Sequence, residues 1–348
     1  MAQSIILTSG SPLIGSPIIV SVTADSVSSS ATFHQVKLKV VAALSTDTVY
    51  TESVLASPCK NGEAVTFDIS SALRAAAAKY EHLRLSADTT YPYIKYTLSA
   101  WDYYMIEGYM HENKNPVNYN SGATLYALFG AATDAERYYS GSSMSVTAFS
   151  RKPSTGEVCA LGDLYVAPQA PTTSVTMTST ITKGASVKVV TLSTVGLQTV
   201  AGRTVYVDGN AQNRIQFQFV NGFGCIESAS AETLPTVSNS GESSIENMTA
   251  PASFNRFSRL SVSKQARQPV IKCSTGAVNK EWANWWINEF MGSDPFRNGG
   301  HGQCWVMLSG KWWPCIIIPD DDMKVVDGTK GDLIYLEFEA RIAIGGAI

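Results

Sequence analysis

A strict alternation of apolar and polar residues near the C-terminus constrains the fold of this chain more than any other feature. One set of positions is apolar and the set between them is polar or charged: Ile334, Leu336, Phe338, Ala340, Ile342 and Ile344 against Tyr335, Glu337, Glu339 and Arg341. A period of two residues places the two sets on opposite faces of a β-strand. The segment is therefore predicted to be a strand with one buried face.

The same period recurs along the chain and predicts a protein built mostly from strands. It is clear at residues 18–24, 35–40 and 215–219. Turn residues between such segments predict three hairpins. They join 144–150 to 157–161, 203–207 to 215–220 around Asp208-Gly209-Asn210, and 303–308 to 311–318 around Ser309-Gly310. Residues 228–250 contain few apolar side chains and are predicted to form an exposed loop.

Helical signals are few and short. Residues 71–80 are rich in alanine and follow Asp68 and Ser70, either of which can cap a helix. Residues 280–291 follow Asn279 as a cap, and a third short helix is possible at 133–139. In the 280–291 segment, positions i, i+3, i+4 and i+8 are aromatic, and this stripe predicts packing against a sheet. The four aromatic residues are Trp282, Trp285, Trp286 and Phe290.

These patterns predict a mainly β fold with minor helices, divided into two domains. We expect an N-terminal β-sandwich over residues 1–166 and a linker over 167–175, where two prolines and several hydroxyl residues occur. A C-terminal β-rich domain is expected over 176–348. Six of the seven tryptophans lie between Trp282 and Trp313. The core of the second domain is therefore predicted to be the helix at about 279–291 packed on a sheet.

The composition limits the classes of partner. The chain has 348 residues, of which 16% are charged, against roughly 25% in ordinary globular proteins. This shortage fits an all-β protein rich in Ser and Thr, and it equally fits a surface covered by neighbouring subunits. The net charge is −3 and no cluster of Lys or Arg occurs, so nucleic acid is not an expected partner. No apolar run of about 18 residues occurs, so membrane insertion is not expected, and no basic residue precedes Lys37, so a secretion signal is not predicted.

No motif in the sequence predicts a catalytic or metal site. Nucleotide-binding and nucleophile-elbow motifs are absent, and the His111-Glu112 pair lacks the second histidine of a zinc protease. The six cysteines are scattered without a CxxC pair, so free and mostly buried thiols are expected. The four histidines lie far apart in the sequence. We therefore expect no enzyme activity, no cofactor, and no catalytic or metal-ligating residues. A glycine-rich loop around His301 and an acidic loop at 320–332 are the places where local sequence leaves binding open.

Aromatic residues leave open a second function, which is carbohydrate binding. Residues 91–109 contain seven Tyr or Trp residues, and Trp312 and Trp313 are adjacent. Such residues pack into sandwich cores or pair across strands, but exposed rings also stack on sugars. The alternative prediction is a carbohydrate-binding or adhesin module.

Four segments in this order resemble tail structural proteins of phages and prophages of Bacteroidales bacteria. They are residues 31–40 with 67–74 (FDISSALR), 127–136 (ALFGAATDAE), 213–227 ending in NGFGCIE, and 274–293 followed by 311–318. The family has a Gly-Gly pair where this chain has Gly224-Cys225.

The resemblance implies a virion component, a tail, ring, hub or baseplate-type subunit. Such a subunit forms homo-oligomers and contacts neighbouring tail or virion proteins, and it is assembled in the cytoplasm of the host bacterium. The resemblance implies no catalytic or metal-ligating residue. The expected function is therefore that of a structural virion protein acting through protein–protein assembly.

Overall fold

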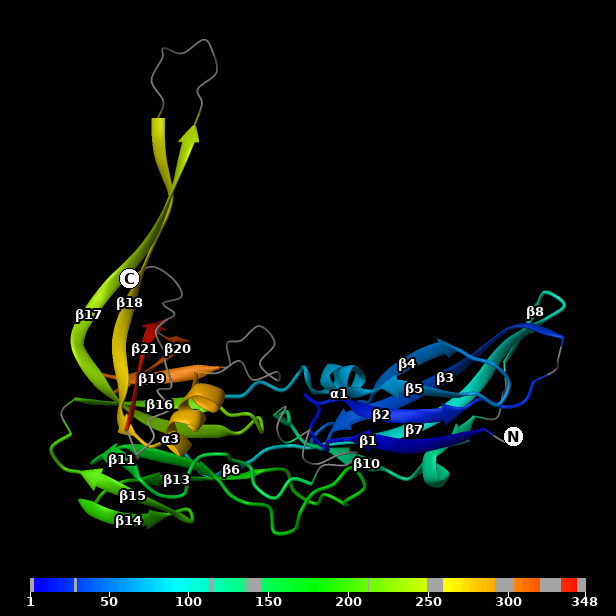
Figure 1. The fold of residues 1–348 in the computed structure, drawn as a ribbon, viewed down its shortest axis with the longest axis horizontal. Coiled ribbons are helices and arrows are strands. Elements are labelled where there is room, and N and C mark those ends of the chain that lie inside the picture. Colours follow the sequence, from blue (N-terminus) through cyan, green and yellow to red (C-terminus); the bar gives the residue numbers. More distant parts are fainter. Residues whose placement is uncertain are drawn as a thin grey trace.

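The computed structural model shows an elongated, mainly β protein with minor helices, as the sequence predicts (Figure 1). A sandwich containing the N-terminal strands occupies one end, and a barrel with a long projecting hairpin occupies the other. The structure describes residues 3–27, 30–112, 116–133, 136, 145–211, 213–248, 259–291, 303–319 and 333–342, and for residues 9–10, 234–248 and 259–268 it describes the backbone alone.

Two sheets form the N-terminal sandwich. Their facing sides share one core, in which alternate residues of β2 and β3 such as Val20 and Leu38 are fully buried. This confirms the period-two prediction for both strands. One sheet has the order β1 (Ser4–Gly10), β2 (Ile18–Thr23), β5 (Ala64–Asp68). The other has the order β10 (Leu125–Ala127), β7 (Ile94–Ile106), β3 (Ala31–Leu44), β4 (Thr51–Pro58), and β8 (Tyr109–Glu112) and β9 (Val117–Asn118) also pair with β7.

Helix α1 (Ser70–Ala77) covers one end of this sandwich core, and a 3₁₀ turn, η1 (Tyr119–Gly122), follows β9. The Asp68 carboxylate accepts hydrogen bonds from the backbone N–H groups of Ser70 and Ile18, at 3.0 and 3.1 Å. It thereby joins the start of the helix to β2. The helix predicted at 71–80 is confirmed, although it spans Ser70–Ala77. Its N-cap residue is Ile69, which makes no side-chain cap hydrogen bond, so the prediction of Asp68 or Ser70 as the cap is wrong.

Two small sheets lie beside the barrel, on the side away from the projecting hairpin (Figure 1). The expected domain boundary falls inside one of their strands, since residues 166 and 167 both belong to β12 and are buried. At the other end of the expected linker, Val175 forms a bridge with Val146. One sheet has the order β12 (Leu164–Pro168), β13 (Ser186–Thr191), β6 (Thr89–Thr90), and the other β11 (Glu157–Ala160), β15 (Arg203–Asp208), β14 (Gly196–Val200).

The C-terminal strands close into a barrel. Its strand order is β16 (Arg214–Val220), β17 (Ile226–Met248), β18 (Arg259–Val278), β21 (Ile334–Ile342), β20 (Lys311–Pro319), β19 (Cys304–Leu308). Helix α3 (Lys280–Trp285) and the π-helical turn η2 (Trp286–Phe290) pack their aromatic stripe into the barrel core. The side chain of Asn279 accepts a hydrogen bond from the Trp282 N–H at 3.0 Å, which confirms the predicted cap. The predicted helix and its packing are therefore confirmed.

The hairpin predictions succeed at one of three places. β19 and β20 form the predicted hairpin, with Ser309 and Gly310 at positive φ in the turn. The predicted pairing of 144–150 with 157–161 is wrong, because β11 instead runs parallel to β15. The pairing of 203–207 with 215–220 is also wrong, because β15 pairs with β14 and β11. Turn residues mark where the chain reverses, but they do not determine which strand lies alongside.

The segment predicted as a polar loop, 228–250, is mostly strand, since β17 extends to Met248. A two-stranded ribbon needs no continuous apolar face, so its sequence lacks the signal that identified the other strands.

The possible helix at 133–139 lies largely outside the described residues, and the loops around His301 and at 320–332 lie wholly outside them. In the part of the chain that the structure describes, no helix is both long and apolar enough to cross a membrane.

Candidate functional site

A buried ionic junction joins the small sheets to the barrel. The Lys152 side chain is 1% exposed, and its ammonium contacts the Glu157 carboxylate and donates to the Ser228 carbonyl oxygen at 2.7 Å. The Tyr165 hydroxyl donates to the other oxygen of Glu157 at 2.9 Å. A buried cation is stable only with such partners. Lys152 therefore fixes β11 and β12 against β17.

Arg151, the preceding residue, makes the second part of this junction. Its guanidinium donates to Glu136 at 2.7 and 2.8 Å, to Glu289 at 2.6 Å and to the Ala131 carbonyl oxygen at 2.9 Å. Glu289 also accepts from the Gly222 N–H at 2.8 Å. These contacts connect the segment after β10, the turn after β16 and the π-helical turn η2.

Glu227 lies at the centre of the junction and is fully buried. Its carboxylate accepts hydrogen bonds from Ser150 at 2.5 Å and from Asn221 at 3.2 Å, and Arg203 lies 3.4 Å away. Burial raises the pKa of Glu227, and the charges of Arg203 and Lys152 only partly oppose that effect. The hydrogen-bonding groups around Glu227 are directed at one another, which is typical of a structural network.

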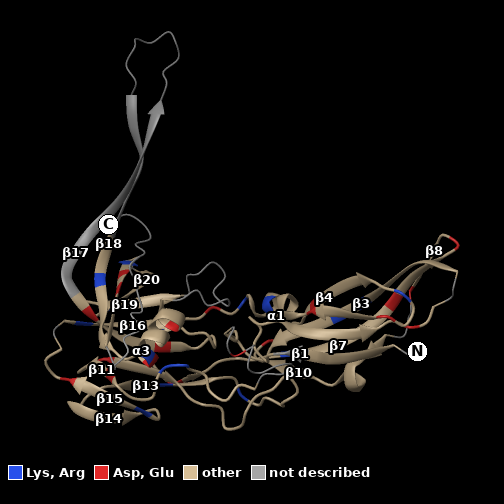
Figure 2. Cartoon of the chain, viewed as in Figure 1, with Lys and Arg blue, Asp and Glu red and all other residues tan. Residues whose placement is uncertain are grey.

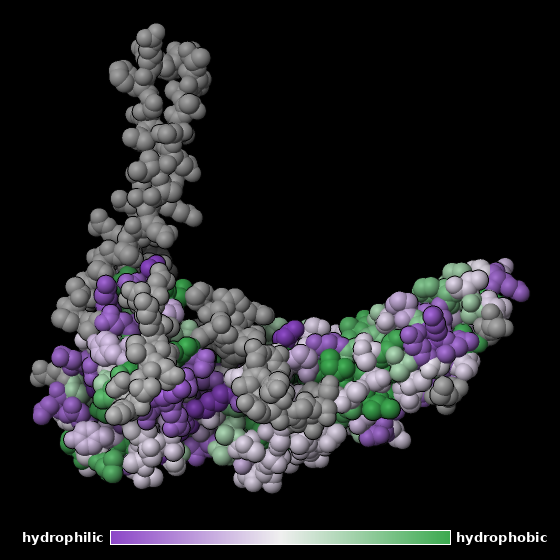
Figure 3. Space-filling model, in the orientation of Figure 1, coloured by the Kyte–Doolittle hydropathy of each residue, from purple (hydrophilic) through white to green (hydrophobic). Residues whose placement is uncertain are grey.

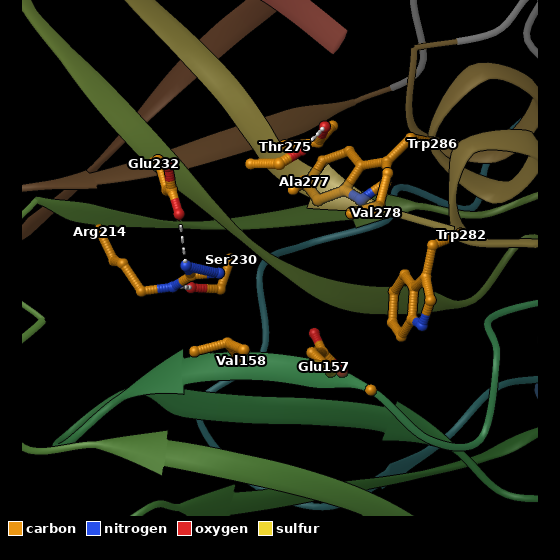
Figure 4. A pocket seen from close by; sticks show the side chains of 12 residues that line it. Glu157, Val158, Arg214, Ser230, Glu232, Thr275, Ala277, Val278, Trp282 and Trp286 are labelled. Carbon is orange, nitrogen blue, oxygen red and sulfur yellow. Dashed lines mark hydrogen bonds and ion pairs between the residues drawn. The ribbon is translucent and has the colours of Figure 1, made fainter. Parts of the chain in front are cut away.

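A pocket of about 450 Å³, counting its open mouth, lies between β11 and the barrel. Figure 4 shows Arg214 directed toward Glu232 and Ser230 on one side and two tryptophans on the other. The guanidinium lies 3.4 Å from both partners. Of the two carboxylates that line the pocket, Glu232 pairs with Arg214 and Glu157 pairs with Lys152 of the junction. Each carboxylate of the pocket is therefore held by a basic side chain.

An apolar surface covers the outer face of the β11-β15-β14 sheet. Leu197 and Tyr206 face each other across β14 and β15 and are 75% and 48% exposed. Val195, just before β14, and Leu161, just after β11, are also exposed apolar residues of this sheet. We call these four residues the outer apolar face. Figure 3 shows apolar surface at this corner of the molecule (green, lower left). Because β14 is an edge strand, an open strand edge borders this face.

Charged side chains do not gather on any one element of the described chain. Figure 2 shows Lys and Arg intermingled with Asp and Glu along the sandwich, the small sheets and the barrel. Within the described residues, no element carries a continuous basic stripe.

The aromatic residues proposed for sugar stacking divide between core and surface. Tyr91 and Tyr96 are 3% and 1% exposed and belong to the cores. Tyr109 is 74% exposed in the turn region of β7 and β8. Trp313 is 39% exposed, while Trp312 is half-buried. The stretch 91–109 therefore does not form a single aromatic platform.

The cysteines are free, and five of the six are buried, as the sequence predicted.

The comparisons with known proteins give no identification, because no family model, no curated protein and no solved structure matches the chain.

Proposed function

We propose that this protein is a structural virion protein of a tailed phage, a homo-oligomeric tail, ring or hub subunit without enzyme activity. Its partners are further copies of itself and neighbouring tail or virion proteins. The virion identity rests on the four-segment resemblance, and the assembly role is supported by the surfaces of the fold.

The β17–β18 hairpin is the observation that carries the proposal. Near the barrel, β17 pairs with β16 over 226–232 and β18 pairs with β21 over 270–278. Beyond these limits the two strands pair with each other as far as Met248 and Arg259. Within the described residues, no other strand pairs with 239–248 or 259–268. The hairpin therefore extends beyond the barrel as a two-stranded ribbon (Figure 1).

A ribbon of two strands is only marginally stable in water without further packing. Both of its outer edges also carry unpaired backbone N–H and C=O groups, which pair readily with another chain. A long ribbon of this kind is therefore suited to contact a neighbouring subunit. In a ring, each subunit would present its ribbon to the next one, and such head-to-tail contacts close when the rotation between subunits permits.

The outer apolar face supports the same function. Its four side chains are exposed in the single chain, and an exposed apolar surface beside an open strand edge is typical of an interface. The small fraction of charged residues agrees, since charged side chains are depleted at the centres of interfaces.

Assembly is tested by light scattering after size-exclusion chromatography and by electron microscopy of the full chain. The decisive variant replaces residues 239–269 with Asn-Gly, which closes the hairpin directly after the Ser238–Val270 pair. We expect the natural chain to form a closed oligomer and the shortened chain to remain monomeric while keeping a cooperative thermal unfolding transition. A natural chain that stays monomeric at high concentration, alone and with neighbouring tail proteins, would contradict the proposal.

A second variant separates the outer apolar face from the hairpin. Leu197→Lys with Tyr206→Lys places charge on this face, whereas Val54→Lys places charge on β4, where the side chain is also 53% exposed. We expect the double variant to weaken assembly and the Val54 control to assemble normally. If the double variant and the Val54→Lys control assemble equally well, the outer apolar face is not part of the interface.

A further inference from the structure

Three side chains with metal-ligating atoms meet inside the N-terminal sandwich. His34 on β3 and Asp102 on β7 belong to neighbouring strands, and His34 Nε2 lies 2.7 Å from Asp102 Oδ1. Cys59 is the first residue after β4, and its N–H donates to the His34 carbonyl oxygen at 3.0 Å. One nitrogen, one sulfur and one oxygen atom from these residues all lie within 4.8 Å of one another.

Two of the three side chains are buried and Cys59 is half-buried, and acidic groups lie close to them. The side chains of Asp102 and His34 are 1% and 6% exposed, and both oxygens of Asp102 accept from the Asp25 N–H, at 3.2 and 3.3 Å. Glu63 adds a second negative charge near Cys59. In the described part of the chain no Lys or Arg pairs with Asp102. A buried carboxylate is costly without a cation or a full set of donors.

The imidazole of His34 is also incompletely bonded. Its Nδ1 atom is buried and has no hydrogen-bond partner among the described residues. Buried polar atoms are nearly always satisfied in native proteins, and those that are not call for an explanation.

We propose that His34, Cys59 and Asp102 bind a zinc ion. Imidazole, thiolate and carboxylate are the ligands that zinc prefers, at bond lengths of about 2.0–2.3 Å. Tetrahedral coordination at these lengths separates ligand atoms by roughly 3.3–3.8 Å. Separations of up to 4.8 Å in the cluster would have to shorten by about 1 Å. The 2.7 Å contact between His34 Nε2 and Asp102 Oδ1 would have to lengthen by roughly 0.6 Å, as this hydrogen bond is exchanged for two metal bonds. Three protein ligands leave the fourth position to water.

The bound zinc would join three strands at one end of the sandwich. It would link β3, β7 and the residue after β4. Its positive charge would also compensate the buried Asp102 carboxylate, which no Lys or Arg among the described residues contacts. A metal that binds the folded chain alone raises its apparent stability in proportion to ligand concentration and affinity. The zinc would thus stabilise the N-terminal sandwich, whether or not the protein assembles.

The test uses the full chain, stripped of metal and titrated with Zn²⁺ against a chromophoric chelator and, separately, with Co²⁺. We expect one equivalent of zinc, an increase in melting temperature, and a thiolate-to-cobalt charge-transfer band. Cys59→Ser keeps the size of a half-buried side chain, and it should abolish the cobalt band and weaken zinc binding by at least about 10-fold. Asp102→Asn is a second variant, which keeps the shape of the side chain but removes its charge, and it should also weaken zinc binding.

The matched control is Cys304→Ala, which removes a thiol in the barrel opposite Cys315 and leaves the three-residue cluster intact. It should retain the cobalt band and the zinc affinity. A natural chain that binds no stoichiometric zinc would overturn the proposal and leave a structural His34–Asp102 pair. Zinc binding that survives Cys59→Ser but is lost in Cys304→Ala would also overturn it, by placing the metal in the barrel.

Discussion

Individual side chains of β16 show that alternation along a strand does not always separate core from solvent. Phe217 faces the barrel core, as its position in the pattern predicts. Gln216 and Gln218 face the other way, yet they are 6% and 0% exposed. Gln216 exchanges two hydrogen bonds with the backbone of Leu164, at 2.6 and 3.2 Å, and Gln218 does the same with Leu85, at 2.9 and 3.0 Å. Two segments that pack outside the barrel, at Leu164 and Leu85, are therefore held to β16 by side-chain amides and not by strand pairing.

Gly224 is a residue for which the structure makes a sharp stability prediction. It has a φ of +68°, and an added Cβ would lie 2.5 Å from the Cβ of Phe129. Positive φ costs alanine about 1 kcal/mol and the overlap adds about 1–3 kcal/mol. We expect Gly224→Ala to lower the free energy of unfolding by about 2–4 kcal/mol in urea titrations.

Gly162→Ala is the matched control for that substitution. Gly162 also has a positive φ, of +90°, but nothing lies within 4 Å of an added Cβ. Gly162→Ala should therefore lower the free energy of unfolding by only about 1 kcal/mol. Equal losses at the two positions would show that the contact between Gly224 and Phe129 is not tight.

Among the elements, helix α3 with η2 is the best predicted from sequence, because its signals are local. The cap and the aromatic stripe both depend on residues within one or two turns, and the stripe is buried on strands that come before and after it in the sequence. Ring centroids of Trp286 and Phe290 lie 4.8 Å apart in an edge-to-face arrangement, and Trp286 also packs 5.9 Å from Phe338.

Trp286 and Trp313 provide a matched pair at this scale. Trp286 is 3% exposed and Trp313 is 39% exposed, and both belong to the C-terminal half. Trp286→Ala should lower the free energy of unfolding by about 3–5 kcal/mol, because a large cavity replaces the indole. Trp313→Ala should cost less than about 1 kcal/mol. Chemical denaturation monitored by circular dichroism measures both, and similar losses would contradict the observed packing.

At the scale of the whole molecule, an aromatic cluster joins the sandwich to the barrel. His82 lies between Tyr80, Tyr91 and Phe129, with ring centroids 4.9, 5.6 and 5.3 Å away. Burial lowers the pKa of His82 to about 4, although a hydrogen bond with the Gly224 backbone opposes the shift. The imidazole is therefore neutral in the folded protein at pH 7.

The lowered pKa of His82 predicts a loss of stability in acid. The ordinary pKa is 6.5 and the folded value is about 4, so between these values the unfolded chain binds more protons than the folded chain. This contribution is complete above pH 6.5 and is lost as the pH falls toward 4. For a side chain that keeps some solvent contact, we expect the loss to be about 2–3 kcal/mol.

The measurement compares the natural chain with His82→Phe, which keeps an aromatic ring but cannot be protonated. The difference between their free energies of unfolding should shift by about 2–3 kcal/mol in favour of the variant between pH 7 and pH 4.5. His111→Phe, at an exposed histidine, serves as the control and should show a much smaller shift. A difference that does not change with pH would show that His82 is not buried at this junction.

Local sequence signals suffice to predict the mainly β class, helices α1 and α3, the β19–β20 hairpin and the buried face of β21. Each of these depends on a period, a cap or a two-residue turn, all of which act between residues close in the chain. The sequence also gave no sign of a metal site, because His34, Cys59 and Asp102 are separated by long stretches and share no motif.

Long-range packing, by contrast, determines which strands pair, where the polar ribbon β17–β18 runs, and which distant side chains meet. The parallel pairing of β11 with β15 and the insertion of β6 beside β13 both join segments far apart in sequence. Backbone hydrogen bonds are the same for every partner strand, so the partner is selected by burial of whole faces and by contacts such as Lys152 with Glu157. The proposed zinc site and the ionic junction exist because that selection brings their side chains together.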